Sequence, residues 1–211
     1  MTIAPNVSQT TDTSALVAEF AGSNTTSYDI LVGVGLVKDS DAVFFQYKGD
    51  DKKEALRQDN DKPVTRIAPV QITNVKIEEN PYANSGFSGT KLNIEFVTQG
   101  GRTVCLTSGL TTMWSQCMIT ALCGLMNSNG LGHLVAIDSW KGNSKYGTCF
   151  ASIRDNGIKV SDQAVYDTLK DARATKNFEL RDQVLRDSVA VLQGCLSIIP
   201  AQVTEAEEVQ F

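Results

Sequence analysis

The segment from Trp140 to Arg154, WKGNSKYGTCFASIR, brings aromatic and cationic side chains together in one short stretch. Aromatic rings stack on nucleic-acid bases, and Lys and Arg pair with phosphates. Alternate residues of an extended strand share a face, so Tyr146 and Phe150 lie on the same side as Arg154. The opposite side carries small apolar residues that predict a core face: Cys149, Ala151 and Ile153. These residue types predict sequence-tolerant binding of single-stranded DNA or RNA.

The candidate binding set joins this face to nearby loop cations and to two cations from neighbouring predicted strands. Its members are Trp140, Lys141, Lys145, Tyr146, Phe150, Arg154, Lys91 and Arg102. Two interpretations stay open for the aromatic residues. An exposed face favours nucleic acid, whereas a face covered by the C-terminal helices favours a structural or adaptor protein. A separate aromatic run, Phe44, Phe45 and Tyr47, fits a hairpin core better than a stacking surface.

The sequence offers little for catalysis or for metal binding. It contains no phosphate-binding loop, no nucleophile elbow, no zinc-protease motif and no dinucleotide fingerprint. The single histidine, His133, precedes an apolar run and is predicted as a strand residue. The cysteines form no C-x-x-C pair and predict reduced core residues: Cys105, Cys117, Cys123, Cys149 and Cys195. We therefore predict no enzymatic activity, no metal and no cofactor.

The formal net charge of −5 is concentrated near the two ends of the sequence. Asp12 and Glu19 near the start, with Glu205, Glu207 and Glu208 near the end, equal the whole excess. Residues 63–161 carry eight Lys and Arg against five Asp and Glu, a local excess of +3. This distribution permits a polyanionic ligand.

Composition predicts a single folded domain in the cytoplasm. Hydrophobic residues make up 42% and charged residues 20%, as in ordinary globular proteins. Residues 1–26 lack Lys, Arg and a long apolar run, which argues against a secretory signal, and no stretch is apolar enough to cross a bilayer. We expect a flexible arm at 1–26, one globular domain at 27–200 and an acidic tail at 201–211.

Alternation and turn signals predict the order of elements. A hairpin over residues 28–48 and a charged loop over 50–62 precede three strands at 65–78, 89–98 and 102–107. An uncharged helix at 110–126, capped by Ser108, is expected to be covered on more than one face. Strands at 132–140, 146–154 and 158–160 follow, then helices at 162–174, capped by Ser161 or Asp162, and at 177–199.

A helix between the third and fourth of five strands is the element order of the OB-fold, which this chain resembles. The segment EAEEVQF, Glu205 to Phe211, resembles the acidic tip of bacterial and phage single-stranded DNA-binding proteins, although Val209 and Gln210 replace the Pro that usually precedes the Phe. The resemblance implies a mainly β protein with α-helices: an OB-like five-stranded barrel over about 64–160, extended by the hairpin and the C-terminal helices. It also implies a replication or repair protein that docks on Glu205, Glu207, Glu208 and Phe211. For the added hairpin and C-terminal helices two roles stay open, the interface of a homo-oligomer or the cover of a sheet edge.

Overall fold

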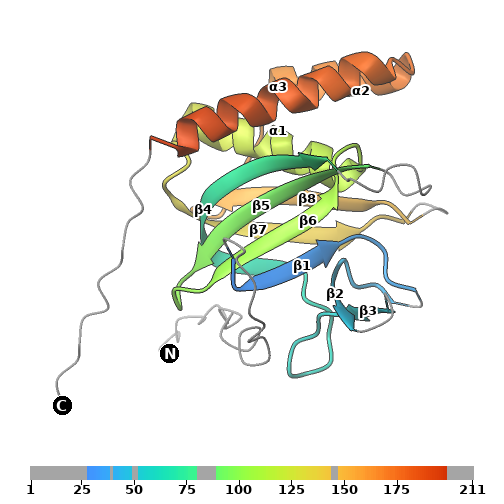
Figure 1. The fold of residues 1–211 in the computed structure, drawn as a ribbon, viewed down its shortest axis with the longest axis vertical. Helices are drawn as coiled ribbons and strands as arrows, with labels where there is room; N and C mark the ends of the chain where they lie inside the picture. Colours follow the sequence, from blue (N-terminus) through green and yellow to red (C-terminus); the bar gives the residue numbers. More distant parts are fainter. Residues whose placement is uncertain (1–27, 39, 49–51, 80–88, 144–146, 199–211) are drawn as a thin grey trace, which may run out of the picture.

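One curved sheet with helices along one side forms the molecule, as Figure 1 shows. The computed structural model describes residues 28–38, 40–48, 52–79, 89–143 and 147–198. The strands are β1 (Ile30–Val34), β2 (Phe44–Lys48), β3 (Lys52–Ala55), β4 (Arg66–Glu79), β5 (Thr90–Thr98), β6 (Thr103–Gly109), β7 (Leu134–Lys141), β8 (Cys149–Asp155) and β9 (Ile158–Val160). The helices are α1 (Met113–Ser128), α2 (Gln163–Ala174) and α3 (Phe178–Leu196). The predicted combination of β and α structure is confirmed as a mixed α/β fold.

The strands follow the order β3-β2-β1-β6-β5-β4-β7-β8-β9 in a single nine-stranded sheet. The five strands predicted to form a barrel are β4 to β8, which lie in the order β6-β5-β4-β7-β8. A closed barrel would require β6 to pair with β8. Instead β1 pairs with β6 in parallel, with Ile30 opposite Val104. In the part of the chain that the structure describes, the nine-stranded sheet is therefore not closed, and the predicted OB-like five-stranded barrel is not confirmed.

Of three local predictions, one is confirmed and two are wrong. The N-terminal hairpin is confirmed, because β1 and β2 pair antiparallel with Gly33 opposite Phe45. The charged loop was wrong at residues 52–55, which form β3 and pair with β2. Lys53 and Glu54 show no alternation of apolar residues that would predict a strand. They form one because they pair with the edge of β2 that β1 leaves unpaired. His133 lies in a bend just before β7 rather than within the strand.

Helix α1 begins one turn later than predicted. Its cap is Thr112, whose side chain accepts a hydrogen bond from the Ser115 backbone N–H. Ser108, the predicted cap, lies within β6, and its hydroxyl is 3.1 Å from that of Thr112. Every residue from Met118 to Leu125 is buried, which confirms that α1 is covered on more than one face.

All three helices share one core with the sheet. Trp114 and Met118 of α1, together with Leu185 of α3, belong to the same buried cluster as Ile94 and Ile153 of the sheet. The predicted thiols are confirmed as free, and Cys105, Cys123 and Cys149 are buried. Burial raises the pKa of Cys105 to about 12 and the pKa of Cys123 to about 11, so both remain protonated at neutral pH. Among the described residues, no helix is both long and apolar enough to span a membrane.

Candidate functional site

A stacked aromatic pair, Trp140 and Phe150, lies on the face of β7 and β8 that points away from α1. The two residues are direct cross-strand partners. Their ring centroids lie 6.0 Å apart, and the ring planes meet at 18°. Trp140 remains 41% exposed, whereas the other tryptophan, Trp114, is 1% exposed. The exposed part of the Trp140 indole is therefore available to a planar ligand.

Gly142 fixes where the Phe150 ring lies. A Cβ atom at position 142 would be 2.5 Å from Cε2 of Phe150. Any larger residue at this position would have to displace the Phe150 ring at the end of β7. The Trp-Lys-Gly sequence at 140–142 thus supplies both a stacking residue and the space for its partner.

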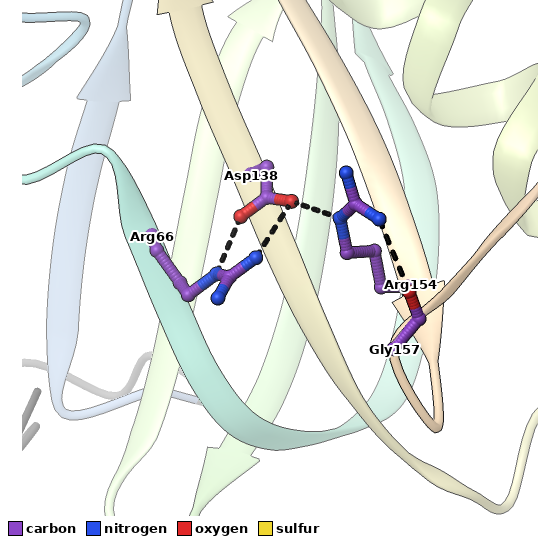
Figure 2. Close-up of polar contacts among 4 residues, drawn as sticks. All are labelled: Arg66, Asp138, Arg154 and Gly157. Atoms are coloured by element: carbon purple, nitrogen blue, oxygen red, sulfur yellow. Dashed lines mark hydrogen bonds and ion pairs between the residues drawn. The ribbon is translucent and has the colours of Figure 1, made fainter. Parts of the chain in front are cut away.

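On the same face of β7 as Trp140, Asp138 binds two arginines, Arg66 and Arg154, and Figure 2 shows these three residues. Arg66 of β4 donates from Nε to Oδ1 of Asp138 at 2.6 Å and from Nη2 to Oδ2 at 3.1 Å. Arg154 of β8 donates from Nε to Oδ2 of Asp138 at 2.8 Å and from Nη1 to the Gly157 carbonyl at 3.0 Å. The Arg66 and Arg154 side chains stay 51% and 40% exposed. Asp138 therefore orients two guanidinium groups that solvent still reaches.

The hydrogen bonds of this cluster favour the ionised states of Asp138 and Arg66. Burial acts to raise the pKa of Asp138, but the hydrogen bonds from Arg66 and Arg154 outweigh it and hold that pKa below its ordinary value. The hydrogen bond to Asp138 also raises the pKa of Arg66. At neutral pH two positive charges and one negative charge leave the cluster with a net charge of +1.

Strand alternation and register bring these side chains together. Asp138 and Trp140 are two residues apart on β7 and so share a face. Ile137 and Ser139 point to the other side, where the Ser139 hydroxyl accepts a hydrogen bond from Nε1 of Trp114 at 2.9 Å. Arg66 enters the cluster because it lies opposite Asp138 in the pairing of β4 with β7. We call Trp140, Phe150, Arg66, Asp138 and Arg154 the outer face of β7–β8.

The helices do not cover this outer face. Cys149, Ala151 and Ile153 alternate with Phe150 along β8, and they belong to the core that the helices share. Phe150 is half-buried and points to the opposite side. Phe150 therefore lies on the side of β8 away from the core that the helices share.

The remaining predicted cations take different positions. Lys141 is exposed at the end of β7, and its Nζ donates to the Ser40 carbonyl at 3.3 Å. Lys91 pairs opposite Glu78, at the end of β4 away from Arg66, so it does not join the cluster. Arg102 is exposed in the turn between β5 and β6. Six other predicted residues lie outside the described residues: Lys145, Tyr146, Glu205, Glu207, Glu208 and Phe211.

Sequence reasoning missed Arg66 and Asp138 as members of the site. The spacing of Asp138 from Trp140 is a signal that was available, since both lie on one strand face two residues apart. Arg66 carried no such signal. Its contact with Asp138 spans 72 positions of the sequence and depends on the register between β4 and β7.

In the described segments, no three His, Cys, Asp or Glu side chains lie close enough together to share a metal ion. Comparison with known proteins adds no relative: no family model, no curated protein and no solved structure matches this chain.

Proposed function

We propose that this chain binds single-stranded nucleic acid, DNA or RNA, on the outer face of β7–β8 and with little sequence preference. The observation that carries the proposal is the exposed Trp140, stacked on Phe150 and lying on the same strand face as the Arg66, Asp138 and Arg154 cluster. A base stacks on Trp140, and the neighbouring phosphates contact the guanidinium groups.

The arginine cluster supports phosphate contact because Asp138 orients both guanidinium groups and the hydrogen bonds described above use only some of their N–H donors. Each guanidinium has five N–H donors. The hydrogen bonds described above use Nε and Nη2 of Arg66, and Nε and Nη1 of Arg154. The other donors are available to a phosphate oxygen, and the net charge of the cluster favours an anion.

The order of the five central strands also supports this proposal. We interpret β4 to β8, with α1 between β6 and β7, as an OB-like unit that β1 keeps open at β6. OB-folds bind oligonucleotides on strand faces and nearby loops. The outer face of β7–β8 lies on the fourth and fifth strands of this unit. It adjoins the loop that joins them, which corresponds to one of the two binding loops of OB-folds, whereas the binding strands of OB-folds, the second and third, correspond to β5 and β6.

Intrinsic fluorescence tests the proposal, because Trp114 and Trp140 differ so strongly in exposure. Titration with an oligothymidine of about 16 nucleotides should quench Trp140 and leave Trp114 unchanged. The logarithm of the association constant should fall with the logarithm of salt concentration by about 0.7 per phosphate contacted. Trp140→Ala should weaken binding roughly 5- to 150-fold, which corresponds to the loss of one stacked base.

Phe178→Ala is the matched control for Trp140→Ala. Phe178 is also an exposed aromatic residue, 62% exposed, and also contacts an arginine, with Cζ of Arg181 at 5.1 Å from its ring centroid. It lies on α3 and not on the sheet face, so its removal should leave affinity unchanged. No binding at low salt, or equal affinity for the Trp140→Ala and wild-type proteins, would refute the proposal and favour a structural or adaptor role.

A further inference from the structure

Besides Trp140, the sheet carries another exposed aromatic residue, Tyr47 of β2, with Lys53 of β3 beside it. Phe45 and Tyr47 share one face of β2, with ring centroids 5.3 Å apart and ring planes at 89°. Lys53 of β3 lies opposite Tyr47 in the register. Its Nζ lies 4.5 Å from the centroid of the Phe45 ring. We call Tyr47 and Lys53, supported by Phe45, the β2–β3 patch.

The buried ring of Phe45 fixes the position of this patch on the sheet. Phe45 is 3% exposed, and its ring covers Gly33 of β1. A Cβ atom at position 33 would lie 2.3 Å from Cε2 of Phe45, so only glycine allows this packing. Tyr47 stands against the edge of the fixed Phe45 ring and remains 54% exposed. An aromatic ring that is positioned by its neighbours and still solvent-accessible suits base stacking.

The β2–β3 patch and the outer face of β7–β8 share a side of the sheet. On β1 and β2, Ile30, Val32 and Phe44 point into the core that the helices cover, so Phe45 and Tyr47 point away from it. On β7 and β8, Ile137 and Ile153 point into the same core, and the aromatic pair points away.

The curvature of the sheet brings these two regions together although they belong to opposite ends of the strand order. The Lys141 ammonium reaches the Ser40 carbonyl in the connection between β1 and β2, at 3.3 Å. In that connection, Cδ1 of Leu36 lies only 3.0 Å from where a Cβ atom of Gly147 would be. Gly147 has a φ of +58° and lies just before β8. The connection between β1 and β2 therefore contacts the segment just before β8 and the end of β7.

One lysine lies beside each aromatic group, Lys141 after Trp140 at the end of β7 and Lys53 with its Nζ over the Phe45 ring. Burial raises the pKa of the Cys149 thiol, and the positive charges of Lys141 and Lys53 both act to lower it. Both ammonium groups therefore lie within electrostatic range of the first residue of β8. A polyanion that extends from Trp140 to Tyr47 therefore has Lys141 next to the first of these residues and Lys53 opposite the second.

We propose that the bound single strand continues from the outer face of β7–β8 across Lys141 and Lys53 to the β2–β3 patch, where Tyr47 stacks a second base. This inference rests on the proposed function. It adds Tyr47 and Lys53 to the binding residues, and it gives the β1–β3 extension of the five central strands a role in binding.

Oligonucleotide length separates this inference from the proposed function. With an oligothymidine of about 4 nucleotides, Trp140→Ala should weaken binding and Tyr47→Ala should not, because a short strand does not reach both sites. With about 16 nucleotides, each substitution should weaken binding about fivefold or more, and the double substitution should combine both losses. Tyr47→Phe keeps the ring and should bind like the wild-type protein.

Lys53 provides a second and independent measurement. Lys53→Gln should reduce the salt dependence of binding to the longer oligonucleotide by about 0.7 in the logarithmic slope, and Lys53→Arg should restore it. Thermal unfolding of each variant checks that the protein remains folded. If Trp140→Ala weakens binding while Tyr47→Ala and Lys53→Gln leave the longer complex unchanged, the continued path is wrong and the proposed function stands. If no oligonucleotide binds, the proposed function itself fails.

Discussion

Asp138 is the residue on which the candidate site depends most. It accepts hydrogen bonds from both Arg66 and Arg154, and its side chain is only 18% exposed. Without this carboxylate, two guanidinium groups of like charge would lie side by side and repel each other. The negative charge of Asp138 therefore reduces the repulsion between Arg66 and Arg154, so that both can lie next to the aromatic pair.

The lowered pKa of Asp138 predicts how the stability of the protein depends on pH. A carboxyl group whose pKa is lower in the folded state stabilises the fold above its unfolded pKa, about 3.9 for Asp. That stabilisation is lost as the pH falls through the lower, folded pKa. Urea denaturation at pH 7 and near pH 3 should therefore show a smaller difference in unfolding free energy for Asp138→Asn than for the wild type. The change should be about 1 kcal/mol or less, because the pair is partly exposed.

Asp61→Asn is the control for this measurement. Asp61 also pairs with an arginine, Arg57, at 3.7 Å, but its side chain is 88% exposed. Its left-handed backbone, with φ of 62°, accepts asparagine readily. The Asp61→Asn protein should keep the pH dependence of the wild type. An unchanged pH dependence for Asp138→Asn would show that the cluster adds nothing to folding.

Among the secondary-structure elements, helix α1 makes a close backbone contact with the residues that begin α2. The Asp162 backbone N–H donates to the Thr120 carbonyl at 3.0 Å, and the Asp162 side chain caps α2 through the Val165 N–H at 2.9 Å. Gly124 of α1 faces this segment. A Cβ atom at position 124 would lie 2.4 Å from the Ser161 carbonyl carbon, which is backbone and cannot rotate away.

Gly124→Ala and Gly194→Ala should therefore change stability in opposite directions. Both glycines lie inside helices, where alanine is favoured by up to about 1 kcal/mol. A Cβ atom at position 194 would meet no described atom within 4 Å beyond its own stretch of helix, so Gly194→Ala should show this gain. Gly124→Ala must displace the backbone at Ser161 and should destabilise the protein by about 1–3 kcal/mol. Urea denaturation measures both values, and a stabilised Gly124→Ala protein would contradict the contact.

The sequence predicted correctly those elements whose ends are marked by neighbouring residues, and it missed those that depend on pairing with a distant strand. Strand β9 and helix α2 lie where the sequence placed them, because Asn156-Gly157 and Asp162 mark their boundaries locally. Strand β3 was missed since its residues belong to a strand only through pairing with β2. Likewise, alternation predicted which β8 residues share a face, but the partner of Asp138 depended on the register of β4. The parallel pairing of β1 with β6, which extends the sheet beyond the five central strands, has no local signal either.

At the scale of the whole molecule, the helices that follow the sheet in sequence belong to its core. Leu169 of α2 and Leu192 of α3 lie in the same buried cluster as Phe96 of β5 and Val104 of β6. The helices and the sheet therefore bury a common apolar surface, and neither layer keeps that surface covered without the other. This shared core predicts that the described part of the chain folds as one cooperative unit.

Two spectroscopic probes test this cooperativity in a Trp140→Phe background, where Trp114 is the remaining tryptophan. Trp114 reports on the contact between α1 and β7 through its hydrogen bond to Ser139. Far-UV circular dichroism reports mainly on the helices. The two unfolding curves in urea should coincide. Leu192→Ala should shift both midpoints together, with a loss of about 2–5 kcal/mol, because Leu192 is fully buried.

The adjacent residue supplies the control, since Val191 is 52% exposed on the same turn of α3. Val191→Ala removes apolar atoms that solvent already reaches, so its effect should stay within about 0.5 kcal/mol. If Leu192→Ala melted the helices at a lower urea concentration than it released Trp114, α3 would be a separately unfolding layer. The aromatic and arginine residues would then rest on a sheet that is stable without α3. Coincident curves would instead mean that substitutions in α3 perturb the outer face of β7–β8 only by unfolding the whole protein.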